Sequence, residues 1–192
     1  MENLIVDYVE KINNSFNDEI KLNIRILAEA LIDAWERKIN VYICGNGGSA
    51  GNAIHLANDF NYGIDKRGGL GLRIDALPAN QSIVTCIAND EGYDKIYSQQ
   101  LKVKANKGDV LIVLSGSGNS MNIVNALTIG NELGMNTFAI LGFSGGICKA
   151  LAKVAIHFPV NDMQVSEDLQ TIVGHICMQW LAAYKLKEEN EK

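Results

Sequence analysis

Proline is scarce in this sequence, with two residues among 192, and no linker-like, repeated or low-complexity stretch divides the chain. No run approaches the roughly 18 consecutive apolar residues that a membrane-spanning helix needs. The chain begins MENLIVDYVEKINNSF, which lacks the basic start and continuous apolar stretch of a secretory signal. These absences predict a single domain over residues 1–192, located in the cytoplasm, with no membrane partner.

The charge balance and the missing nucleotide motifs exclude further classes of protein. A formal net charge of −5 argues against nucleic acid as a partner, although one phosphate needs only a local group of donors. No GxxxxGK[ST] segment is present, and GNGGSAG does not match GxGxxG in register, so P-loop nucleotide binding is not expected. The cysteines have no CxxC spacing and lie in apolar neighbourhoods, so we expect buried, reduced thiols at Cys44, Cys86, Cys148 and Cys177.

The apolar pattern that is present predicts an α/β fold. Helical segments alternate with short β-favouring runs, which are NVYIC at 40–44, LRIDAL, VLIVLS at 110–115, NTFAIL and VAIHFPV. Strands that alternate with helices imply crossover connections and a parallel sheet, and the run VLIVL indicates a strand covered on both faces. We therefore expect a three-layer α/β/α sandwich that ends in a long helix capped near Asn161 or Asp162.

Two amphipathic helices are predicted before the first strand, within residues 1–38. Apolar residues recur at helical spacing from Leu4 to Ile12 and again from Leu27 to Trp35. A small sheet offers these helices no evident place, so we expect them to pack against another subunit in an oligomer.

Two small turns rich in hydroxyl and amide groups follow predicted strands. The first, at 46–49, reads Asn-Gly-Gly-Ser, and the second, at 115–120, reads Ser-Gly-Ser-Gly-Asn-Ser. Ligands of open parallel sheets bind at the carboxyl ends of the strands. In the second turn, glycines let backbone N–H groups close on a ligand, and the helix that follows adds free donors. This turn predicts a phosphate site.

At these residues the chain resembles the sugar isomerase (SIS) fold and, within it, the bacterial phosphoheptose isomerases. The matching segments are CGNGGSAGNAIH, TCIANDEGYDKIYSQQ, LSGSGNS and a Gly-His pair in the last helix, and the resemblance covers nearly the whole chain. It implies a five-stranded parallel sheet, a homotetramer and a zinc ion in the site. The implied reaction converts sedoheptulose 7-phosphate to a heptose 7-phosphate for surface polysaccharide, such as lipopolysaccharide or capsule.

The resemblance also implies which residues form the site. Its substrate-binding positions fall on Asn46, Ser49, Asp90, Ser115, Ser117, Asn119 and Ser120. The zinc ligands that we expect are His55, Asp59, Glu167 and His175. The residues expected to transfer protons are Asp59 and His175, with the assignment of base and acid open.

Three positions depart from the family pattern. Asp59 stands where the family has glutamate, Glu167 where it has glutamine, and Gly63 where it often has arginine. The basic residues close enough in sequence to replace that arginine are Lys66, Arg67 and Arg73. These departures leave the predicted phosphate loop intact and leave the identity of the sugar open.

Spacing alone supports part of this site. His55 and Asp59 are four residues apart and so share one helix face, a spacing that suits two ligands of one metal. Glu167 and His175 are eight residues apart, which separates them by about 12 Å and about 80° on an ideal helix. Gln170 or Thr171 is therefore an alternative neighbour for His175. A carboxylate bound to zinc is a poor base, so the two roles expected of Asp59 compete.

Two other functions are also compatible with the sequence. The first is isomerisation of a different phosphosugar, such as a six-carbon one. The second is a non-catalytic role as a phosphosugar sensor or partner-binding SIS protein. Loss of the histidine and carboxylate positions would favour the second function, whereas His55, Asp59 and His175 are all present.

Overall fold

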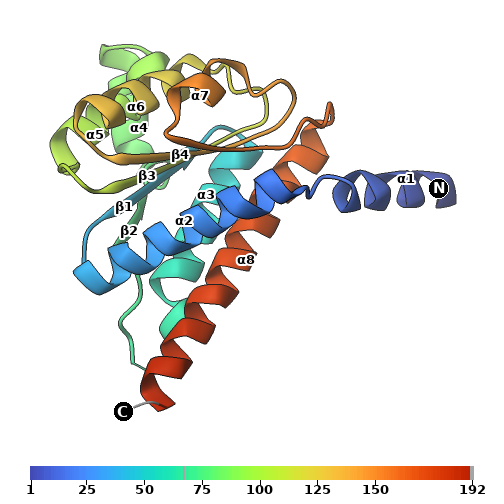
Figure 1. Ribbon diagram of the computed structural model, residues 1–192. Helices are drawn as coiled ribbons and strands as arrows, with labels where there is room; N and C mark the ends of the chain where they lie inside the picture. Colours follow the sequence, from blue (N-terminus) through green and yellow to red (C-terminus); the bar gives the residue numbers. More distant parts are fainter. Residues whose placement is uncertain (67, 191–192) are drawn as a thin grey trace.

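A five-stranded, all-parallel sheet forms the centre of the computed structural model (Figure 1), with strand order β2-β1-β3-β4-β5. The structure describes residues 1–66 and 68–190, and side chains up to residue 185. The strands are β1 (Val41–Gly45), β2 (Ile74–Ala76), β3 (Val110–Ser115), β4 (Asn136–Leu141) and β5 (Val154–His157). The longer helices are α1 (Glu2–Asn13), α2 (Asp18–Arg37), α3 (Gly48–Asn61), α4 (Gln81–Asp90), α6 (Met121–Glu132) and α8 (Met163–Asn190). The shorter ones are η1 (Gly63–Asp65), η2 (Tyr93–Lys95), α5 (Ser98–Lys104) and α7 (Gly146–Leu151).

Helices cover both faces of the sheet, which confirms the predicted three layers. On one face, apolar side chains of α2, α3 and α8 pack against alternate residues of the strands in one buried cluster. On the other face, α5, α6 and α7 pack against the remaining strand residues in a second cluster. Figure 1 shows the two groups of helices on opposite sides of the strands. Because β1 and β3 are buried at every residue, their carboxyl ends are held rigidly between the layers.

The first two helices differ from each other, and the expectation that neither has a place on the sheet is wrong for α2. Asn17 caps α2 by accepting a hydrogen bond from the Ile20 N–H at 2.9 Å, and α2 buries a stripe that includes Leu27 and Leu31. In α1, by contrast, no residue is buried, and Leu4 and Val9 are exposed. Figure 1 shows α1 extending away from the rest of the molecule.

Asp162 caps α8, as the sequence predicted. Its Oδ1 accepts a hydrogen bond from the Val165 N–H at 3.3 Å. The Lys11 ammonium, which donates to Asp162 Oδ2 at 2.8 Å, lowers the pKa of this carboxyl and joins α1 to the start of α8. Tyr8 adds a second link through its hydroxyl, which donates to Asp168 Oδ2 at 2.7 Å.

The cysteines are free thiols, and three of them are buried as expected. Burial raises the pKa of Cys148 to about 11 and that of Cys177 to about 12, so both are neutral at physiological pH. The prediction of a buried thiol is wrong for Cys86, which lies exposed on α4, a helix without buried residues.

Candidate active site

The two predicted turns meet at the carboxyl edge of the sheet. They follow β1 and β3, which are hydrogen-bonded neighbours in the sheet. Between them lies a cavity of about 270 Å³ whose lining residues are Asn46, Gly47, Gly48, Ser49, Leu114, Ser115, Gly116, Ser117, Ser120, Met163 and Glu167. This placement agrees with the general rule that open parallel sheets bind ligands beyond their strand ends.

The serine-rich turn is held in shape by its own side chains. Ser115 Oγ accepts from the Gly118 N–H at 3.0 Å, and Ser117 Oγ accepts from the Asn119 N–H at 3.3 Å. Gly118 has a φ of +66°, and a Cβ there would lie 2.0 Å from the Gly145 carbonyl oxygen, so only glycine fits. Three of the residues predicted to bind phosphate, Ser115, Ser117 and Ser120, line the cavity.

Asn119 has a different position from the one expected for a substrate contact. Its Oδ1 accepts from the Ile147 N–H at 3.1 Å, and its Nδ2 donates to the Ser117 carbonyl at 3.2 Å. The side chain therefore ties the turn to α7, and it is not among the residues described as lining the cavity.

The sequence did not indicate the residues that orient Asn46. The amides of Asn46 and Asn122 exchange hydrogen bonds in both directions, at 2.9 and 2.7 Å, and Tyr93 Oη donates to Asn46 Oδ1 at 3.1 Å. Asn122 is 2% exposed and also accepts the Ile123 N–H. The partners lie 47 and 76 residues from Asn46. Asn122 lies two residues after the serine turn, and nothing in the sequence around it indicates Asn46 as its partner.

A polar seam runs between α3 and α8, leading away from the cavity. Gly48, Asn52, His55 and Asp59 recur at positions that place them on one face of α3. At the cavity end, a Cβ on Gly48 would lie 2.3 Å from Glu167 Oε2, so the carboxylate of α8 lies directly over this glycine. Further along, Asn52 Nδ2 donates to the Glu167 carbonyl at 2.9 Å and to Gln170 Oε1 at 3.2 Å.

His55, Asp59 and His175 converge at the far end of the seam. His55 Nε2 and His175 Nε2 are 3.0 Å apart. Asp59 Oδ2 lies 3.5 Å from His55 Nε2 and 3.4 Å from His175 Nε2. The helices approach closely here because residue 174 is glycine, where a Cβ would lie 2.2 Å from Leu56 Cδ2. Asp59 and His55, rather than Gln170 or Thr171, are thus the neighbours of His175.

The donor chemistry of this cluster fits a divalent metal. Its three ligand atoms lie within 4.8 Å of one another. Two Nε2 atoms facing each other, with a carboxylate oxygen beside them, present the nitrogen and oxygen donors that zinc takes. With three protein ligands, one position on a tetrahedral ion would be left for a further group.

The structure does not bring Glu167, the fourth expected ligand, to this cluster, and Asp90, expected to bind the substrate, is not among the residues described as lining the cavity. Glu167 lies at the cavity, two turns of α8 before His175, so the metal role predicted for it stays a prediction. Asp90 is exposed at the end of α4, where its carboxylate accepts from Asn89 Nδ2 at 2.8 Å.

The basic residues proposed to replace the missing arginine are also elsewhere. Arg73 donates to the Lys38 carbonyl at 3.1 Å, at the opposite edge of the sheet. Lys66 is exposed in the loop after η1. Arg67 lies outside the described residues.

Comparisons with known proteins identify the family of this chain. A family model described as the SIS domain matches residues 6–142. A phosphoheptose isomerase of Helicobacter pylori strain P12 is 34% identical over 182 residues, which cover 92% of this chain and 91% of the relative.

Solved structures share the fold of this chain. A phosphoheptose isomerase of Francisella tularensis superposes with a TM-score of 0.89 at 22% identity, covering 95% of this chain and 96% of the other. One of Neisseria gonorrhoeae gives a TM-score of 0.84 at 25% identity, covering 94% and 96%. Among the described residues, no helix is long and apolar enough to span a membrane.

Proposed function

Because this chain belongs to the SIS domain family, and its curated relatives are named phosphoheptose isomerases, we propose that it interconverts sedoheptulose 7-phosphate and a heptose 7-phosphate. The observation that carries the proposal is the polar seam, which connects a serine-lined cavity to a cluster of two imidazoles and a carboxylate. The first end suits a phosphate, and the second suits proton transfer next to a carbonyl group.

The cavity binds the phosphate in this proposal. Ser117 and Ser120 offer hydroxyl groups. The helix α6 begins at Met121, and the N–H groups that precede Ile123, whose own N–H is bonded to Asn122, offer further donors to the same anion. Asn46 and Ser49, on the facing turn, bind the hydroxyl groups of the sugar next to the phosphate.

The length of the seam favours a long sugar. Gly48 at the cavity and His55 at the cluster are seven residues apart on α3, which corresponds to about 10 Å along the helix. An extended seven-carbon chain spans such a length between its phosphate and its carbonyl group, whereas a five-carbon chain is shorter. Glu167 lies beside the cavity, where its carboxylate accepts hydrogen bonds from sugar hydroxyls.

The reaction moves one proton between neighbouring carbons. A base removes a proton from C1 of the ketose, and the electrons of that bond form an enediolate with the charge on O2. A proton returned to C2, with transfer of the O1 proton to O2, then yields the aldose. In this proposal Asp59 and His175 carry out these transfers, and His55 supports them, with its Nε2 3.0 Å from His175 Nε2 and 3.5 Å from Asp59 Oδ2.

His55, Asp59 and His175 would hold a zinc ion in the same cluster. Such an ion would polarise the substrate carbonyl and stabilise the charge of the enediolate. A carboxylate that ligates zinc is a weak base, so Asp59 serves either the metal or the proton transfer in a given turnover.

Assembly and location complete the proposal. We infer that α1 joins subunits of a homotetramer, because its exposed apolar residues Leu4, Ile5, Val6 and Val9 lack cover within the described part of one chain. The product would supply surface polysaccharide synthesis from the cytoplasm.

Alanine at residue 48 tests the role of Glu167. In Gly48→Ala, the new methyl group displaces the Glu167 carboxylate from its place over α3, since the two would otherwise overlap. We expect kcat/KM for sedoheptulose 7-phosphate to fall by about tenfold to a hundredfold with little change in thermal stability.

The matched control is Gly51→Ala on the same helix, where a Cβ meets nothing within 4 Å. This control should keep full activity and gain about 0.5–1 kcal/mol of stability from helix propensity. Equal kcat/KM values for the two variants would contradict a role of Glu167 in binding the sugar.

A further inference from the structure

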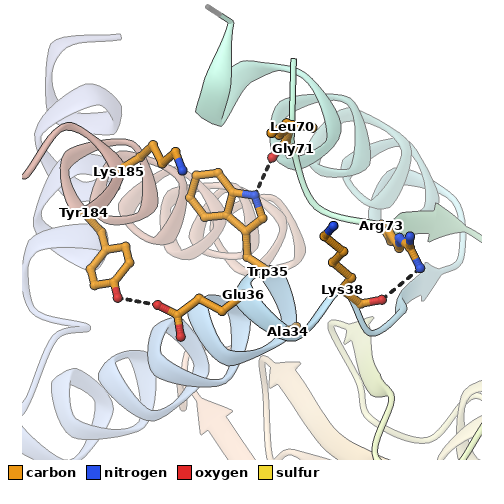
Figure 2. Close-up of a pocket in the computed structure, with 9 residues that line it drawn as sticks. All are labelled: Ala34, Trp35, Glu36, Lys38, Leu70, Gly71, Arg73, Tyr184 and Lys185. Carbon is orange, nitrogen blue, oxygen red and sulfur yellow. Dashed lines mark hydrogen bonds between the residues drawn. The ribbon is translucent and has the colours of Figure 1, made fainter. Parts of the chain in front are cut away.

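A second cavity lies at the edge of the sheet opposite the candidate active site. It is formed where α2 ends, just before β1, and where the chain enters β2. Its volume is about 420 Å³, and its lining residues are Ala34, Trp35, Glu36, Lys38, Leu70, Gly71, Arg73, Tyr184 and Lys185 (Figure 2). A cavity of this volume suits a small organic ligand.

One wall of this cavity is flat and apolar. The Trp35 indole is half-buried, and its Nε1–H donates to the Leu70 carbonyl, which fixes the plane of the ring. Leu70 is 66% exposed beside it. Such a wall favours a ligand with a planar ring, because aromatic rings stack on indole with a gain beyond area burial.

The other side of the cavity is cationic. Lys38 and Arg73 form no ion pair with any carboxylate in the described part of the chain, and Figure 2 shows the Lys38 side chain between Trp35 and Arg73. Lys185 Nζ lies 5.9 Å from the centroid of the Trp35 ring. Among the described lining residues, Glu36 alone is acidic, and its carboxylate accepts a hydrogen bond from the Tyr184 hydroxyl.

Capping of α2 accounts for only part of this charge. Arg73 Nη1 donates to the Lys38 carbonyl at 3.1 Å, which satisfies the end of the helix with one of five guanidinium donors. Lys38 itself has a left-handed backbone with a φ of +56°, a position that glycine usually fills. The lysine side chain is therefore not what the cap requires.

We propose that this cavity binds a small anion with a flat ring, of the mononucleotide class, at a site separate from the candidate active site. The ring lies against Trp35 and Leu70, and the phosphate lies between Lys38 and Arg73. The carboxyl-terminal part of α8 lines this cavity through Tyr184, while the same helix carries His175 to the cluster.

Intrinsic fluorescence gives a direct readout of this site. The chain has two tryptophans, and Trp180 is on the outside of α8, so a Trp180→Phe background leaves Trp35 as the one emitter. We expect adenosine 5′-monophosphate to quench this emission saturably. Adenosine and inorganic phosphate, each offering half of the contacts, should bind at least about tenfold more weakly.

Lys38→Gly is the decisive variant, because glycine suits the left-handed backbone and the fold should be retained. This variant should weaken the binding of adenosine 5′-monophosphate by about tenfold and leave the turnover of sugar phosphate unchanged. Lys102→Ala, which removes an exposed charge from α5, is the control and should bind as the background does.

The proposal is overturned if the nucleotide gives no saturable quenching, or if Lys38→Gly binds it as tightly as the background does. If adenosine binds with the same affinity as the nucleotide, the anion contact is excluded. If inorganic phosphate binds with that same affinity, the ring contact is excluded.

Discussion

Asp59→Asn is expected to lose about 10²–10⁴-fold in turnover while the protein remains folded, because the change removes a charge and a proton acceptor without changing shape. Asp59 is placed 3.4 Å from His175 Nε2 and 3.5 Å from His55 Nε2, with its side chain 19% exposed. His175→Ala removes the other proton-transferring group and should cost a similar factor. Steady-state kinetics, with circular dichroism to verify the fold, make the measurement.

The matched control for this change is Asp33→Asn on α2. Asp33 is also a carboxylate paired with a basic side chain, Arg37 at 2.8 Å, but its pair is exposed and lies on α2, outside the seam. Its loss should leave turnover unchanged and alter stability by less than about 1 kcal/mol. Folded Asp59→Asn and His175→Ala proteins that work at the wild-type rate would contradict the proposed chemistry.

Zinc is expected to raise the melting temperature of the metal-free protein. A ligand at a hundred times its dissociation constant stabilises the folded state by about 2.7 kcal/mol, or about 5–10 °C for a domain of this size. The cause is the convergence of three ligand atoms within 4.8 Å, which the unfolded chain does not hold together.

His55→Ala should abolish the zinc-induced shift, and His157→Ala should keep it. His157 is a suitable control because its Nε2 contacts the Phe143 carbonyl at 2.9 Å, at the end of β5 and outside the cluster. A shift of equal size in both variants would place the metal elsewhere. Turnover by the chelated protein would assign Asp59 to proton transfer, whereas loss of turnover would assign it to the metal.

The sheet was predictable from the sequence because its signals are local. Each strand is a short, mostly apolar run bounded by glycine or polar residues, and each of the five predicted runs overlaps an observed strand. The docking of α2 was not predictable in this way. Its partners, α8 and β5, lie more than a hundred residues further along the chain, so an amphipathic stripe alone did not reveal what covers it.

The site shows the same division between local and distant information. The pair His55 and Asp59 follows from helical spacing, whereas the arrival of His175 depends on the glycine at 174, which lets α8 approach α3. The hydrogen bonds of Asn122 and Tyr93 to Asn46 connect three separate segments and left no pattern to recognise. Glu167 was expected beside His175, although eight residues of helix separate them along the axis by about 12 Å.

The most direct test of the central claim is a coupled turnover assay of the purified, metal-analysed protein on sedoheptulose 7-phosphate, with pentulose and hexose phosphates in parallel. The account predicts turnover of the heptulose phosphate in preference to the shorter sugars, because the seam from the serine-lined cavity to the cluster matches the longer chain. Preference for a shorter sugar would agree with the proposed isomerisation and contradict the proposed seven-carbon substrate. Phosphosugar binding without any turnover would contradict the enzyme and indicate a sensor or partner-binding protein.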